Sequence, residues 1–254
     1  GMGARAEWRY AHQEAMSAIL LFLFLSQKLD RPVRAVPDPG VVTTRQQITP
    51  AGVPSVFQGR VYGVRFGADD SELWVLGQTH VWALDWRENK VKTRALHGAA
   101  GAGLQSLVYA DGKAYFAGRY TKGGARLMRQ VGAAPEEVAG ELGRELPGAL
   151  AIGGGKALLP LVTDNKLAVV ELASGKVLGR VETGIAPFGA VVDRAGSVAW
   201  VTNWGGRKAT EKDLTAPTGY AATADRVAVD ARGIASTGTV TRIDSSPSTA
   251  THSN

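Results

Sequence analysis

The sequence predicts an all-β fold, a β-propeller of four-stranded antiparallel blades. Similar apolar segments centred on Trp74, Tyr115, Leu158 and Trp200 recur 41, 43 and 42 residues apart. Another apolar strand and a tight polar or glycine turn precede each segment, so the repeating unit contains a hairpin. A period of about 40–45 residues built from hairpins is typical of propeller blades. The 32 glycines also suit many short strands joined by tight turns.

The third repeat shows the expected plan of one blade. Strands are predicted at 150–152, 156–162, 166–171 and 177–182, and glycine or polar turns separate them. The first repeat follows the same order. We therefore expect blades at about 59–98, 103–143, 147–184 and 186–254, the last of them unfinished. The domain from 59 to 254 is predicted to be a partial propeller of about four blades.

The fourth repeat differs because a long insertion is predicted at 204–237, between two blade strands. It is rich in Gly, Ala, Lys, Thr and Asp, and the next strand is expected at 238–244. A connection of this length inside a compact domain is usually functional or disordered. Ahead of the blades, Pro32, Pro37, Pro39 and Pro50 mark residues 31–58 as a linker that contains one β-strand at 41–49.

The first 30 residues are predicted to be a leader. An uncharged apolar run at 18–25 follows Arg5 and Arg9. The run is shorter than the roughly 20 residues that a membrane span needs, but it matches the core of a secretory signal. A buried helix is the alternative, because Glu7 and Glu14 lie in this segment and a good cleavage site does not follow it. We expect a periplasmic or secreted bacterial protein without a stable membrane span.

Residues 199–203, Ala-Trp-Val-Thr-Asn, resemble the bacterial YVTN-type β-propeller repeat, with Trp200 in the place of tyrosine. The third repeat is similar to the Gly-Lys-Val part of that pattern at 171–177. The resemblance covers about 59–244 and implies a ring that typically has seven blades, of which this chain holds a part. Residues 38–44, 48–50 and 203–206 also resemble secreted proteins that join such a propeller to an alkaline-phosphatase-like phosphoesterase domain. That resemblance implies an N-terminal fragment of a longer protein.

The composition excludes several classes of function. The chain has no cysteine, which rules out disulfides, thiolate metal sites and cysteine nucleophiles. Its net charge of +6 comes from dispersed residues without aromatic residues between basic ones, so nucleic-acid binding is not expected. The four histidines lack metal-ligand spacing, and Gly153–Lys156 is a turn because Leu150 and Ala157 break the phosphate-loop pattern. Asp69 and Asp70 are likewise predicted as turn residues. No catalytic residue, metal or cofactor is predicted.

Binding is expected on one face of the propeller. The loops that join second to third strands, and those that lead into each blade, gather on this face around the channel. The predicted binding residues are Arg119, Tyr120, Lys122, Asn203, Trp204 and Arg207. Their basic character favours a protein partner or a small anionic ligand. Trp204 is the strongest candidate, because an exposed tryptophan in a loop is uncommon. The alternative is that these are ordinary solvated loop residues.

The function predicted from these observations is that of an extracytoplasmic binding or scaffold module. The alternative is a propeller enzyme, of the lactonase or cofactor-dependent oxidoreductase type, with its site at the channel mouth. That alternative needs clustered His, Asp or Glu residues, and the sequence shows too few. Self-association through open blade edges is also expected, because an open row of blades leaves an apolar sheet face bare at each end.

Overall fold

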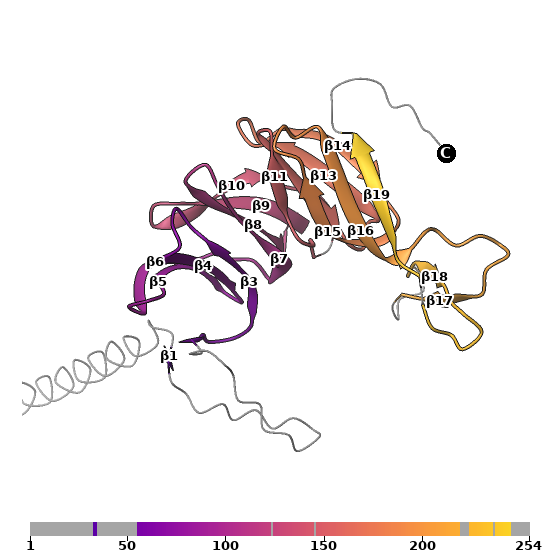
Figure 1. The fold of residues 1–254 in the computed structure, drawn as a ribbon, viewed down its shortest axis with the longest axis horizontal. Coiled ribbons are helices and arrows are strands. Elements are labelled where there is room, and N and C mark those ends of the chain that lie inside the picture. Colours follow the sequence, from indigo (N-terminus) through magenta and orange to yellow (C-terminus); the bar gives the residue numbers. More distant parts are fainter. Residues whose placement is uncertain are drawn as a thin grey trace, which may run out of the picture.

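A row of β-sheets makes up the protein, which confirms the predicted propeller architecture (Figure 1). The computed structural model describes residues 33–34, 55–122, 124–144, 146–218, 224–235 and 237–244. The predicted leader and the strand predicted at 41–49 lie outside the described residues. Just before the blades, β1 (Val33–Arg34) pairs with β2 (Ser55–Val56). In the described part, no helix is long and apolar enough to cross a membrane.

Three sheets are four-stranded antiparallel blades whose strands follow chain order. Blade 1 consists of β3 (Val61–Phe66), β4 (Glu72–Gly77), β5 (His80–Asp85) and β6 (Lys90–Leu96). Blade 2 consists of β7 (Gly101–Ala110), β8 (Lys113–Tyr120), β9 (Gly124–Val131) and β10 (Ala134–Ala139). Blade 3 consists of β11 (Ala151–Gly153), β12 (Lys156–Leu161), β13 (Lys166–Glu171) and β14 (Val177–Glu182).

Blade 4 has three described strands, β15 (Ile185–Val192), β16 (Val198–Gly206) and β19 (Thr239–Asp244). The insertion lies between β16 and β19 and contains a hairpin of β17 (Thr215–Pro217) and β18 (Arg226–Ala228). Because β16 runs on to Gly206, the insertion begins after that residue and not at 204 as expected. Gly205 permits this extension, since a Cβ there would lie 2.6 Å from a methyl carbon of Ile185.

The core lies between the blades, which pack face to face. Trp74 of β4 packs against β7 and β8 of blade 2, and its ring stacks on Tyr109 at 6.2 Å between centroids. Tyr115 of β8 packs in the same way on blade 3, and Leu158 of β12 on blade 4. The apolar residues that revealed the repeat are therefore the contacts between consecutive blades.

Candidate binding face

Two neighbouring pockets open beside the connection from β12 to β13 of blade 3, and the insertion lines one of them. The pocket between blades 2 and 3, here the inter-blade pocket, has a volume of about 640 Å³. The second, here the insertion pocket, has a volume of about 510 Å³ and lies between blade 3 and the insertion. Asp164, in the connection from β12 to β13, lines both pockets. The two hollows are thus adjacent parts of one face.

Basic and acidic side chains alternate around the inter-blade pocket. Asp164 accepts hydrogen bonds from the backbone N of Arg144 at 3.0 Å and from its Nε at 2.9 Å. Across the pocket, Arg180 of β14 donates through Nε to the carbonyl oxygen of Leu142 at 2.9 Å and through Nη2 to that of Glu141 at 2.7 Å. These bonds tie blade 3 to the segment after β10. The pocket walls are therefore fixed by the fold.

The insertion folds back on blade 3 and makes one wall of its pocket. Asn165 donates through Nδ2 to Asp225 of the insertion at 2.7 Å, and its Oδ1 accepts from the backbone N of Ala186 at 2.9 Å. Lys208 of the insertion lies 2.9 Å from Glu182. The hydrogen bond from Lys208 is the main reason that the pKa of Glu182 lies below its usual value. The wall carries Lys208, Thr210, Thr215, Asp225 and Arg226.

Trp204 is 63% exposed, as expected of the strongest predicted binding residue. It belongs to the end of β16, however, and not to a loop. Its ring stacks on that of Phe188 at 4.0 Å between centroids, with 18° between the planes. Arg207 follows and donates two hydrogen bonds to Asp213, at 2.8 and 2.7 Å, which hold the pKa of that carboxyl well below its usual range. The positive charge of Arg207 is thus largely compensated within the insertion.

Two of the predicted binding residues have structural partners. Asn203 is 2% exposed, and its side chain bonds to Gly184 and to two threonines of β19. Tyr120 donates through its hydroxyl to the carbonyl oxygen of His97 at 2.9 Å. Burial raises the pKa of Tyr120 to about 12. Both side chains stabilise junctions between chain segments.

Arg119 and Lys122 lie on blade 2, Arg119 half-buried near the end of β8 and Lys122 exposed in the turn that follows. Trp204 and Arg207 belong to blade 4 and its insertion, so blade 3 and the two pockets separate them from the blade 2 pair. Sequence reasoning missed the pocket residues between them. Arg144 and Arg226 lie in segments for which no strand was predicted, and Arg180 lies in the strand predicted at 177–182, where nothing marked it as a pocket residue.

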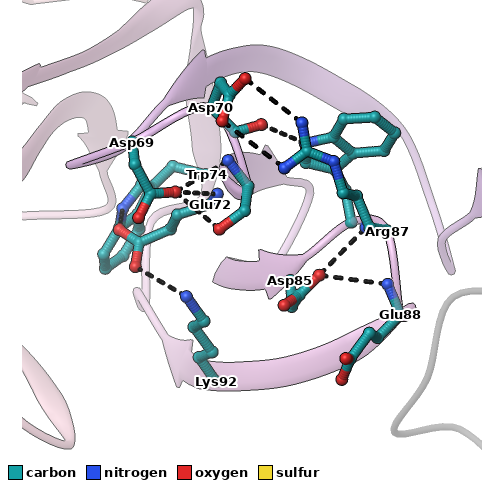
Figure 2. Close-up of polar contacts among 10 residues, drawn as sticks. Asp69, Asp70, Glu72, Trp74, Asp85, Arg87, Glu88 and Lys92 are labelled. Carbon is teal, nitrogen blue, oxygen red and sulfur yellow. Dashed lines mark hydrogen bonds and ion pairs between the residues drawn. The ribbon is translucent and has the colours of Figure 1, made fainter.

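The carboxylate pair of blade 1 is confirmed as turn chemistry (Figure 2). Asp69 accepts from the backbone N of Ser71 at 2.8 Å and from that of Glu72 at 3.1 Å. Asp70 forms an ion pair with Arg87 at 3.2 Å, between the two turns at this end of the blade. The hydrogen bonds of Asp69 stabilise the turn between β3 and β4, and Asp commonly has this role in tight turns. Among the described residues, no group of three or more His, Asp or Glu side chains could hold a metal ion.

The protein is similar in fold to known propeller structures. No protein-family model and no curated protein matches the sequence. Hydrazine synthase of Kuenenia stuttgartiensis aligns with a TM-score of 0.51 and 14% identity over 77% of this chain and 56% of that one. A weaker match is Hsv2 of K. marxianus, with a TM-score of 0.45, 9% identity, and coverage of 60% and 49%. The chain thus spans about half the length of these structures, and the likeness to hydrazine synthase supports the propeller fold alone.

Proposed function

We propose that the protein is a β-propeller binding module that takes a polar peptide segment of a partner protein in the two adjacent pockets. The observation that carries this proposal is the insertion folded against blade 3, because it turns an open propeller end into a concave site. The pockets are lined by both basic and acidic side chains, which suits a peptide with charges of both signs better than a simple anion. The exposed Trp204 ring, stacked on Phe188, offers an aromatic contact on blade 4, on the side of β16 that points away from blade 3.

The wider setting is part of the same proposal. The YVTN-type resemblance and the apolar run after Arg5 and Arg9 favour a periplasmic or secreted bacterial protein. The resemblance to propeller–phosphoesterase fusions favours a larger protein in which this module precedes a catalytic domain. Expression with the natural N-terminus in a bacterial host, followed by osmotic-shock fractionation and N-terminal sequencing, tests the location. The intact mass of the native protein in its source cells tests the fusion.

Peptide binding is tested with a phage-displayed random peptide library selected on the full chain. We expect enriched peptides whose affinity falls at least tenfold for Arg226→Gln, which changes the pocket wall, and for Trp204→Ala. Arg232→Gln is the matched control, because Arg232 lies in the same insertion, 76% exposed and paired with Asp230, but does not line the pocket. Inorganic phosphate serves as a second probe. Binding of phosphate without peptide enrichment would replace the peptide by a small anion.

A further inference from the structure

The face of blade 4 that points away from blade 3 carries exposed apolar side chains as well as Thr202 and Arg242. Val191, Trp200 and Val240 have exposed fractions of 63%, 44% and 58%. Val191 pairs directly with Trp200, and Val240 pairs with Thr202 two residues along β16. Side chains of directly paired residues share a face, and so do residues two apart on one strand, so the three form one patch. We name these three residues the leading face.

The positions equivalent to Trp200 and Val240 are buried in all three earlier blades, whereas the equivalents of Val191 are the exposed Arg65, the half-buried Val108 and the buried Ala151. The equivalents of Trp200 in the second strand are Trp74, Tyr115 and Leu158, and those of Val240 in the third strand are Val81, Leu127 and Leu167. Trp74 packs in one cluster with Leu107 of the next blade, and Leu158 packs with Val201 in the same way. Among the described residues, no blade covers the leading face, although Trp200 and Val240 occupy the positions that make the blade–blade contact elsewhere.

The opposite end of the row carries the other half of such a contact. On β3 of blade 1, Val64 and Phe66 are 49% and 60% exposed on the side away from blade 2. The equivalent positions in blade 2 are Leu107 and Tyr109, which pack on blade 1. Phe57 covers the more distant part of this side through an edge contact with Trp82 at 5.7 Å. Val64 and Phe66, here the trailing face, stay open.

We propose that the leading face binds the trailing face of a second copy of this chain, head to tail. Trp200 of one protomer would then meet Phe66 of its partner as Trp74 meets Tyr109 within the chain. A pairing of two different faces closes on itself when a twofold rotation satisfies both contacts at once. Two rows of four sheets would make a ring of about eight blades, within the range that propellers adopt. Trp204 shares its side of β16 with Trp200, so Arg226→Gln, which changes the insertion pocket and not the leading face, separates this association from the peptide site proposed above.

The mass of the full chain in solution tests the association. By size-exclusion chromatography with light scattering we expect twice the mass of one chain, and half that value for Trp200→Glu and for Phe66→Glu. Leu178→Glu is the matched control, because Leu178 of β14 is 46% exposed but lies on neither end face. This control should keep the doubled mass. Thermal midpoints of all variants verify that they fold.

Mixing the two face variants tests the head-to-tail arrangement itself. Each variant alone has lost every contact, but Trp200 of the Phe66→Glu chain can still meet Phe66 of the Trp200→Glu chain. The equimolar mixture restores one of the two contacts and places two glutamates in the other, so it should regain part of the doubled mass, whereas neither variant alone regains any. A wild-type chain that stays monomeric up to high concentration would overturn the proposal. A doubled mass that Phe66→Glu leaves intact would also overturn it, because the contact would then join two leading faces.

Discussion

Asn203 offers the sharpest test of how blade 4 is held together. It lies in β16 within the segment that resembles the repeat pattern, and sequence reasoning placed it among the binding residues. In the structure its Oδ1 accepts from the backbone N of Gly184 at 3.1 Å, and its Nδ2 donates to the hydroxyls of Thr239 and Thr241 at 3.1 and 3.0 Å. One buried amide therefore joins three segments of the chain, and Asn203→Ala removes these bonds together with a longer one, at 3.4 Å, from Nδ2 to the carbonyl oxygen of Thr239.

The expected cost follows from these contacts. A hydrogen bond inside a protein contributes about 1 kcal/mol net, and a buried donor left without a partner costs about 1–3 kcal/mol. The two threonine hydroxyls can rotate to other partners, whereas the N–H of Gly184 is fixed by the backbone and loses its acceptor. We expect Asn203→Ala to lower the free energy of unfolding by about 3 kcal/mol. For a chain of this size that corresponds to a decrease of about 6–12 °C in the thermal midpoint.

Urea unfolding followed by tryptophan fluorescence measures this effect. Thr202→Ala is the control, because the neighbouring Thr202 is exposed and its hydroxyl accepts one bond from Gly189 at 2.9 Å. We expect its loss to stay below about 1 kcal/mol. If the free energy of unfolding of Asn203→Ala lay within about 1 kcal/mol of the wild-type value, the side-chain amide would not stabilise blade 4 as its hydrogen bonds indicate. A binding role without a structural one would then be the better interpretation.

Three further predictions concern other junctions of the fold. Burial lowers the pKa of His97 below 6.5, so as the pH falls this imidazole takes up a proton in the unfolded chain before it does so in the folded protein. The free energy of unfolding, measured by urea titration, should therefore decrease below about pH 6.5. His97→Gln should flatten this pH dependence. Gly154→Ala should lower the free energy of unfolding by more than about 2 kcal/mol, because φ is +55° and the added Cβ would clash with the carbonyl oxygen of Ala195. An added Cβ at Gly155 would meet no other atom, so Gly155→Ala should lower it by only about 1 kcal/mol. Asp213→Asn should accelerate proteolysis within the insertion while the urea midpoint stays unchanged, because the partly exposed pair with Arg207 orders only that segment.

The propeller could be predicted from the sequence because each blade packs on the next through an apolar residue at the same position of its second strand. Trp74, Tyr115 and Leu158 occupy the same place in their blades, so selection for packing leaves a regular spacing in the chain. The β-strand predicted at 238–244 is confirmed as β19, although the long insertion precedes it. The turn role of Asp69 could also be predicted from the sequence, because its carboxylate accepts hydrogen bonds from residues only two and three positions ahead.

The site could be predicted only in part, because its walls come from segments far apart in the chain. Asp164 and Asp225 line one pocket together, yet nothing local in the sequence links them. Asn203 was taken for a loop residue because it is polar and follows an apolar strand. The alternation of Ala199, Val201 and Asn203 could have placed it on the buried side of β16, where the structure has it. Burial of a polar residue depends on its hydrogen-bond partners, and these are not visible in a strand pattern.

The face-to-face packing of the blades also sets the order in which the protein should open. Within the described residues, blades 2 and 3 are covered by another blade on both faces, whereas blades 1 and 4 each have a described neighbouring blade on one face. In a row where each unit contacts only its neighbours, unfolding starts where a unit has the fewest contacts. Backbone amides of β8 and β12 should therefore exchange with solvent deuterium later than those of β3 and β19. Head-to-tail closure would remove both ends of the row, and the difference in exchange rate between terminal and central blades would disappear with them.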